Sequence, residues 1–139
     1  MEEEYAYLKK RIEEADGFIG YLPITIDSIE TGCVRATLKM TKQILNPFGT
    51  VHGGCLFTVA DSIAGTAAMT HGHYVTTISG HIHYLSPAAG IGGLKIVAEE
   101  IRAGKTILTY DVIFLDERDK VICKATMEYY ALGKITNNE

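Results

Sequence analysis

The stretch Asn46–Gly72, NPFGTVHGGCLFTVADSIAGTAAMTHG, decides how this chain folds and what chemistry it can carry. It contains a single acidic residue, Asp61, which lies in an otherwise apolar segment eight residues after Gly53. Between Glu30 and Glu99 the chain has no other aspartate or glutamate, although it carries 17 acidic residues in all. Because charged side chains are rarely placed among apolar ones unless they are paired or functional, Asp61 is the first candidate for a chemical role.

The segment around Asp61 has the pattern of a helix. From Gly53 to Met69 it contains no proline, shows no two-residue alternation and is apolar on nearly every side. We therefore predict a central helix over residues 53–71. A helix that is apolar all round is expected to be buried inside a fold rather than to lie on its surface.

The rest of the chain predicts one more helix and six strands. Apolar residues recur three or four positions apart over residues 2–15, which predicts an amphipathic N-terminal helix within residues 1–15. Two strands are predicted between residues 20 and 39, and four more over residues 74–87, 92–104, 105–119 and 120–132. Consecutive strands on short turns form an antiparallel sheet, and this sheet must curve to wrap the central helix. We expect a single α+β domain over residues 1–139, in which the sheet edge and the central helix are left partly open and are covered by a partner subunit.

The composition excludes several classes of protein. A net charge of −4 argues against nucleic-acid binding, which needs a basic surface. The charged N-terminal stretch MEEEYAYLKKRIEE predicts neither a signal peptide nor a transit peptide, and no apolar run is long enough to span a bilayer. The three cysteines show no paired or metal-type spacing, which is typical of reduced thiols. A cytoplasmic protein that contacts neither membrane nor nucleic acid is expected.

The motif N-P-F-G-T-V-H-G-G, followed by A-D at residues 60–61 and H-Y-L-S-P-A at residues 83–88, resembles the hotdog-fold acyl-CoA thioesterases. Within them the chain looks closest to the phenylacetic-acid-degradation-type (PaaI-like) group, over about residues 15–132. The resemblance implies the hotdog fold, in which a curved antiparallel sheet wraps one long buried helix. It also implies a homodimer that assembles into a homotetramer. The residues that carry the resemblance are Asn46, Gly49, His52, Gly53, Gly54 and Asp61.

The family roles can be carried over one residue at a time. The resemblance implies that Asp61 is the catalytic carboxylate and that the Gly53 backbone N–H holds the thioester carbonyl. Asn46 and His52 match the polar residues of the adjacent loop, and Thr77 matches a Ser or Thr that orients the attacking water. In the implied dimer the site straddles the interface. Asp61 and Thr77 come from one chain, with Asn46, His52 and Gly53 from the other.

These roles suit thioester hydrolysis. The first turn of a helix offers unpaired N–H donors and the positive end of the dipole, and glycines there let a carbonyl approach closely. An apolar neighbourhood disfavours the charged form of Asp61 and so increases its basicity. Asp61 would act as general base on water or attack directly to give an anhydride. The expected substrates are aryl-acetyl or medium-chain acyl-CoA thioesters, with coenzyme A as part of the substrate and no separate cofactor.

Each role has a purely structural alternative. Asp61 could be a buried carboxylate that accepts hydrogen bonds from loop N–H groups, and the two glycines could form a plain loop-to-helix turn. Asn46 could be only a turn residue. His52 would either fix the loop by hydrogen bonding or contact the substrate. Arg102 and Lys105 flank a predicted strand turn, where they are either ligands of the coenzyme A phosphates or ordinary turn charges.

Two other groups of residues suggest different chemistry. His71 and His73, and His81 and His83, form two His-x-His pairs of a kind that can bind zinc. No cysteine or acid stands near them in sequence to complete a site, so we expect no metal. Cys55 has no oriented His–acid pair in sequence, so packing rather than nucleophilic catalysis is expected.

Two rival functions remain open. A hotdog hydratase or dehydratase is expected to have a His five residues after the Asp, where this chain has Thr66. A non-catalytic module that binds acyl-CoA and regulates another protein would not need Asp61. A thiol-release assay with acyl-CoA substrates separates all three functions.

Overall fold

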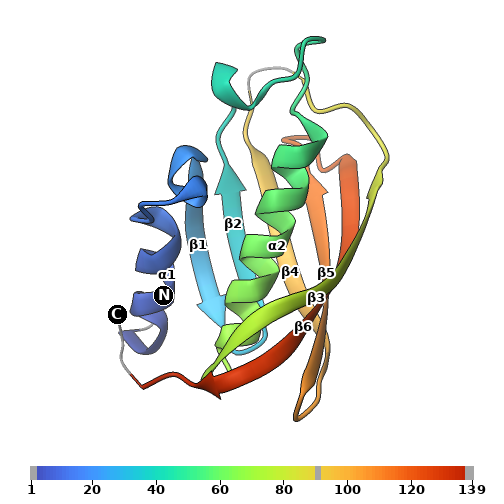
Figure 1. Cartoon of the computed structure of the whole chain (residues 1–139). Helices are drawn as coiled ribbons and strands as arrows, with labels where there is room; N and C mark the ends of the chain where they lie inside the picture. Colours follow the sequence, from blue (N-terminus) through green and yellow to red (C-terminus); the bar gives the residue numbers. More distant parts are fainter. Residues whose placement is uncertain (1–2, 90–91, 137–139) are drawn as a thin grey trace.

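The computed structural model describes residues 3–89 and 92–136 of the 139-residue chain (Figure 1). Its two α-helices are α1 (Ala6–Glu13) and α2 (Gly53–Met69). Its strands are β1 (Ile24–Glu30), β2 (Cys33–Leu38), β3 (His73–Tyr84), β4 (Leu94–Ala103), β5 (Ile107–Leu115) and β6 (Val121–Lys134). The order of helix, two strands, helix and four strands is the predicted one. In the described ranges no helix is long and apolar enough to cross a membrane.

The six strands form one antiparallel sheet in the order β1-β2-β4-β5-β6-β3. The chain therefore passes from β2 through α2 to the opposite edge of the sheet, where β3 pairs with β6. Figure 1 shows α2 lying in the concave face of this curved sheet, with α1 beside β1. The predicted α+β class with a sheet wrapped around a central helix is confirmed.

One face of α2 packs on the sheet through small and β-branched side chains. Val59, Ala60, Ile63 and Ala64 are completely buried. Short side chains let the helix lie close to strands that curve around it. The helix is buried within the fold and, as expected, is left partly open, since Phe57 on its other face is 36% exposed. Apolar composition cannot distinguish a face covered by the chain's own sheet from one that is not.

The two edges of the sheet differ in how they are protected. At the β1 edge, Lys9 of α1 donates to the Ile26 carbonyl (2.7 Å) and Glu13 of α1 accepts from the Ile26 N–H (2.6 Å). Helix α1, which is shorter than predicted, thus satisfies backbone groups of that edge strand. At the other edge β3 is largely exposed, with Ile78 at 49% and Tyr84 at 53%. Long apolar edge strands are normally covered or paired, so β3 is the edge at which we expect a partner subunit to bind.

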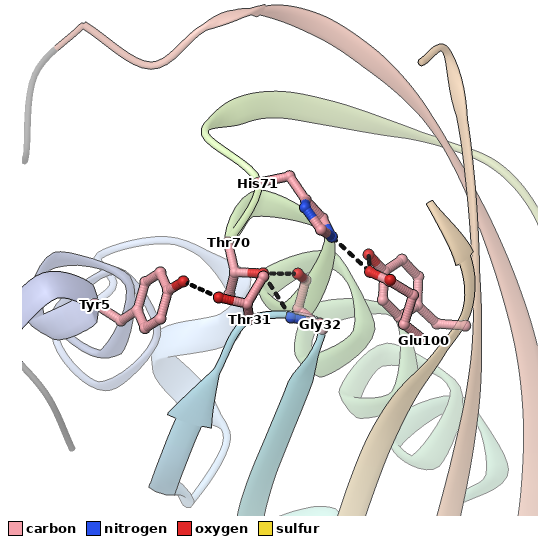
Figure 2. Close-up of polar contacts among 8 residues, drawn as sticks. Tyr5, Thr31, Gly32, Thr70, His71 and Glu100 are labelled. Carbon is pink, nitrogen blue, oxygen red and sulfur yellow. Dashed lines mark hydrogen bonds and ion pairs between the residues drawn. The ribbon is translucent and has the colours of Figure 1, made fainter. Parts of the chain in front are cut away.

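Polar contacts fix the C-terminal end of α2 (Figure 2). The buried Gly32 N–H, in the turn between β1 and β2, donates to the Thr70 hydroxyl (2.8 Å). That hydroxyl in turn donates to the Ala67 carbonyl (2.6 Å). The next residue, His71, bonds the Glu100 carboxylate of β4 through its Nε2 atom (2.5 Å). Together these bonds tie the helix end to the β1–β2 turn and to β4.

Replacing Thr70 should destabilise the fold. Thr70→Val leaves the buried Gly32 N–H without its acceptor, which costs about 1–2 kcal/mol. Thr66→Val is the matched control, because the buried Thr66 hydroxyl donates only to the Ser62 carbonyl within the same helix. Chemical denaturation of both variants checks this. Equal losses of unfolding free energy in the two variants would show that the hydrogen bond from Gly32 contributes nothing to stability.

Candidate active site

Asp61 is half-buried on α2 and is held by side chains from two strands. The Thr77 hydroxyl of β3 donates to Asp61 Oδ1 (2.8 Å). The Tyr129 hydroxyl of β6 lies 2.7 Å from the Asp61 backbone carbonyl and 3.1 Å from the same Oδ1 atom. Asp61 and Thr77, which the resemblance assigns to the same chain of the site, are therefore in direct contact. The alternative in which loop N–H groups hold the carboxylate does not match these contacts.

Asp61 faces a cavity of about 350 Å³ between the N-terminal segment, α2, β3 and β6. Most of the lining is apolar, and Asp61 and Arg11 are its only charged residues among the described part of the chain. The Arg11 guanidinium lies over the Tyr74 ring, 5.8 Å from its centroid. The apolar lining residues are Leu8, Ile12, Ala15, Phe18, Ile19, Met69 and Val75. This cavity can hold an apolar group beside a carboxylate.

Tyr129 is the residue at this site that the sequence analysis missed. Its side chain is only 1% exposed, and burial, followed by the adjacent Asp61 charge, raises the pKa of its phenol. The phenol therefore stays protonated and donates. One sequence signal could have pointed to it: Met127 and Tyr129 alternate with polar neighbours in the last strand, which places both on the side that faces the helix.

The loop before α2 holds the other predicted residues. His52 is the N-cap of the helix, and its Nδ1 accepts from the Gly54 N–H (2.8 Å). The Tyr84 hydroxyl donates to the Gly53 carbonyl (2.7 Å). Within the described residues the Gly53 N–H makes no hydrogen bond. This cap matches the loop-fixing alternative for His52, and it occupies the Gly54 donor while the neighbouring Gly53 donor remains available within the described residues.

Asn46 forms a turn of its own. Its Oδ1 accepts from the N–H groups of Phe48 (2.9 Å) and Thr50 (3.1 Å), and its Nδ2 donates to the Thr50 hydroxyl (2.8 Å). Asn46 and Gly53 line a second cavity of about 270 Å³. The contacts of Asn46 match the turn-residue alternative, while its place in this cavity keeps it beside Gly53.

The two cavities divide the predicted site into halves. Asp61 and Thr77 line one, and Asn46 and Gly53 line the other. Because a helix rises 1.5 Å per residue, Gly53 and Asp61 lie about 12 Å apart along α2. One thioester carbonyl cannot contact both residues of the same chain. A site that uses both needs the loop of one subunit and the carboxylate of another.

The other residues that the sequence suggested as ligands lie outside these two cavities. Arg102 and Lys105 are exposed at the β4–β5 turn, which Figure 1 shows at the far end of the molecule from the loop before α2. His81 and His83 are exposed on β3, with their Nε2 atoms 3.2 Å apart. Over residues 3–89 and 92–136, no group of three or more His, Cys, Asp or Glu residues is arranged to hold a metal.

Comparison with known proteins agrees with this architecture. The sequence model of the Thioesterase superfamily matches residues 48–123. The acyl-coenzyme A thioesterase PaaI of Escherichia coli is 26% identical over 126 residues, which cover 91% of this chain and 90% of PaaI. Its solved structure superposes with a TM-score of 0.87 at 24% identity, over 95% of this chain and 96% of that one.

Two other relatives extend the comparison. The human acyl-coenzyme A thioesterase 13 is 29% identical over 117 residues, which cover 83% of this chain and 79% of that protein. A hypothetical thioesterase protein of Streptococcus pneumoniae, solved with coenzyme A, has a TM-score of 0.78 and 30% identity, over 81% of this chain and 91% of that one. Variants of that protein with one aspartate or one threonine changed to alanine have also been solved.

The wrapped sheet, its central helix and the carboxylate on that helix define the hotdog class of thioester-cleaving enzymes. The chain belongs to the Thioesterase superfamily and is a PaaI-like hotdog thioesterase. The predicted fold and the predicted enzyme class, thioester hydrolase, are both confirmed at the level of the family.

Cys55 should not take part in catalysis. Burial raises the pKa of its thiol to about 11, so very little of the nucleophilic thiolate is present at neutral pH. We predict that Cys55→Ala keeps thioester turnover within about threefold of the parent, since removing a packing group leaves the chemical step intact. Thiol release measures this. An acyl group trapped on Cys55 and detected by mass spectrometry would overturn the prediction.

Proposed function

We propose that the chain hydrolyses acyl-CoA thioesters to the free acid and coenzyme A, with Asp61 as the catalytic carboxylate. The observation that carries the proposal is the Asp61 carboxylate itself, which accepts from Thr77 and faces an apolar cavity. The relatives named acyl-coenzyme A thioesterases support the choice of coenzyme A as the thiol. The two alanine variants of the S. pneumoniae protein also support it, because their changed residues are separated by the same 16 positions as Asp61 and Thr77.

The proposed acyl site is the cavity beside Asp61. Its volume of about 350 Å³ and its mainly aliphatic lining suit a medium-chain acyl or an aryl-acetyl group. Burial of that group against Leu8, Ile12 and Met69 would hold the reacting carbonyl next to the carboxylate. The N-terminal helix thereby becomes part of the substrate site, a role that the sequence motif alone does not assign.

The proposed chemistry begins with the carbonyl. The Gly53 N–H, at the positive end of the α2 dipole, donates to the thioester oxygen and stabilises the negative charge that develops there. As a general base, Asp61 takes a proton from water while the water oxygen bonds to the carbonyl carbon. The tetrahedral intermediate then expels the thiolate as the C–S bond breaks, and the thiolate receives the proton from Asp61.

The second route uses Asp61 as the nucleophile. Its carboxylate oxygen attacks the carbonyl carbon, the C–S bond breaks with loss of the thiolate, and an enzyme-bound anhydride forms. Water then hydrolyses the anhydride and restores the carboxylate. Both routes need the same two groups, an N–H donor for the carbonyl oxygen and a positioned carboxylate.

The proposed assembly is a homodimer, paired into a homotetramer, whose sites lie between subunits. Asp61 and Thr77 come from one chain, and the loop with Asn46, His52 and Gly53 comes from the other. The 12 Å helical separation argued above, the exposed β3 edge and the uncovered Phe57 all support this arrangement. We propose that Asn46 and His52 shape the loop, and we keep Arg102 and Lys105 as candidate contacts for the coenzyme A phosphates.

Removing the negative charge of Asp61 should abolish most of the activity. We predict that Asp61→Asn lowers kcat at least about a hundredfold with little change in KM. Asp111→Asn is the matched control, because Asp111 also accepts from a threonine (Thr126 Oγ1, 3.1 Å) but does not line the Asp61 cavity. The measurement is thiol release over a panel of acyl-CoA substrates. An Asp61→Asn enzyme that keeps its activity but loses thermal stability would make Asp61 a structural residue.

The shared site can be tested by complementation. Gly53→Pro deletes only the N–H donor, since proline is well tolerated at the first position of a helix. The preceding His52 already has ψ of 132°, which suits a residue before proline. Gly53→Ala is the matched control: it brings the same Cβ near Tyr84 (3.1 Å) but keeps the N–H. We expect Gly53→Pro to be inactive and Gly53→Ala to keep most of its activity.

Mixing inactive Asp61→Asn and Gly53→Pro subunits should then restore activity. Random exchange makes about half of the dimers mixed, and each mixed dimer has one site with both groups intact. About a quarter of the parental activity should therefore return. Subunit exchange is verified by mass spectrometry of the intact dimers. Proven exchange without recovery would contradict the shared site.

A further inference from the structure

We infer that Tyr129 is a positioning residue for Asp61. Together with Thr77 it holds the Oδ1 atom of the carboxylate, so that Oδ2 is the oxygen that acts on water or on the thioester. The inference rests on the proposed hydrolysis and deepens it. It assigns a separate task to each carboxylate oxygen and a role to a tyrosine that lies outside the sequence motif.

The first support is the convergence of two donors on one atom. The Thr77 hydroxyl donates to Oδ1 at 2.8 Å, and the Tyr129 hydroxyl lies 3.1 Å from the same atom. Thr77 and Tyr129 are directly opposite each other in the pairing of β3 with β6, so both side chains reach the helix from one face of the sheet. No hydrogen bond to Oδ2 comes from any residue in the described part of the chain.

The second support is the rigidity of the tyrosine. The Tyr129 ring is buried and meets the Tyr110 ring edge-on, with 6.2 Å between the centroids. Gly65 lies one helical turn after Asp61, and a Cβ atom built there would already touch the Tyr129 ring at 3.5 Å. A bulkier residue at position 65 would displace the ring. The absence of a side chain at Gly65 therefore helps to place the phenol against Asp61.

The geometry has a chemical consequence. An oxygen that already accepts two hydrogen bonds is a poorer base and a poorer nucleophile than one that accepts none, because the bonds stabilise its charge. Fixing Oδ1 also fixes the direction in which Oδ2 points, which lowers the cost of reaching the reactive geometry. The general-base route and the anhydride route both need an Oδ2 atom that points at the reacting group. Arg11 of α1 is the only other charged residue that lines the cavity in the described ranges.

A purely structural role for Tyr129 makes a different prediction. The Tyr129 hydroxyl also lies 2.7 Å from the Asp61 backbone carbonyl, so it could serve only to tie β6 to the helix. In that case its removal would lower stability without changing the titration of the carboxylate or the balance between kcat and KM.

The test compares Tyr129→Phe with Tyr110→Phe. Tyr110 is a matched control, because it is equally buried and loses the same atom, while its hydroxyl donates to Glu100 (2.9 Å) rather than to Asp61. We expect Tyr129→Phe to lower kcat about tenfold with KM within twofold. We also expect the acidic limb of its pH–rate profile to move up by about one pH unit, since a bond to the charged carboxylate is lost. Tyr110→Phe should change neither.

A second measurement does not depend on activity. The ¹³Cγ resonance of Asp61, assigned by its absence in Asp61→Asn, reports the titration of the carboxyl group directly. Its midpoint should rise in Tyr129→Phe and stay in place in Tyr110→Phe. If Tyr129→Phe does not fold, the chemical shift of the Tyr129 hydroxyl proton is measured instead in the parent protein. That chemical shift should change in folded Asp61→Asn.

The outcomes are distinct. The positioning role would be overturned if Tyr129→Phe melts at a lower temperature while its ¹³C titration midpoint and the acidic limb of its pH–rate profile stay unchanged. It would also be overturned if the chemical shift of the Tyr129 hydroxyl proton does not change in Asp61→Asn. If the parent enzyme releases no thiol from any acyl-CoA, the proposed function fails, while the ¹³C titration still decides whether Tyr129 holds the carboxylate.

Discussion

The packing of one face of α2 into the concave sheet is the constraint on which the rest of the structure depends. Val59, Ala60, Ile63 and Ala64 are small or β-branched, so the sheet can curve closely around them. Because a helix has only one face for its own sheet, this packing leaves part of the opposite face exposed at Phe57. The same packing brings the middle of α2 next to β3 and β6, the strands that supply the partners of Asp61.

The chemistry follows from where those partners are placed. Thr77 and Tyr129 are cross-strand neighbours, and Asp61 meets both on the concave face of the sheet. The helix that carries Asp61 begins with Gly53, whose N–H makes no hydrogen bond to any described residue and lies about 12 Å from Asp61 along the helix. The geometry of one helix thus separates the proposed catalytic carboxylate from the proposed donor to the thioester carbonyl. Pairing two copies is the simplest way to reunite them, and the exposed β3 edge is suited to that pairing.

Much of the fold could be predicted from the sequence because its periodicities are strong. The apolar run after Gly53, the alternating strands and the short turns gave the correct element order. The site was less predictable. The resemblance placed Asp61 and Thr77, 16 residues apart, in one site without predicting the hydrogen bond between them, whereas Tyr129 lies 68 residues from Asp61 and is brought to it by strand register. The open part of the helix, at Phe57, could not be located in advance, because a sequence does not say which apolar face its own sheet covers.

In the proposed dimer, one catalytic site takes its carboxylate and its carbonyl donor from different subunits. A structure of the protein with a non-hydrolysable acyl-CoA analogue tests this most directly. We predict that the oxygen replacing the thioester carbonyl lies about 3 Å from the Gly53 nitrogen of one subunit, beside the Asp61 Oδ2 atom of another. An analogue whose carbonyl contacts only groups of a single chain, or binds away from Asp61, would show that the site is not shared.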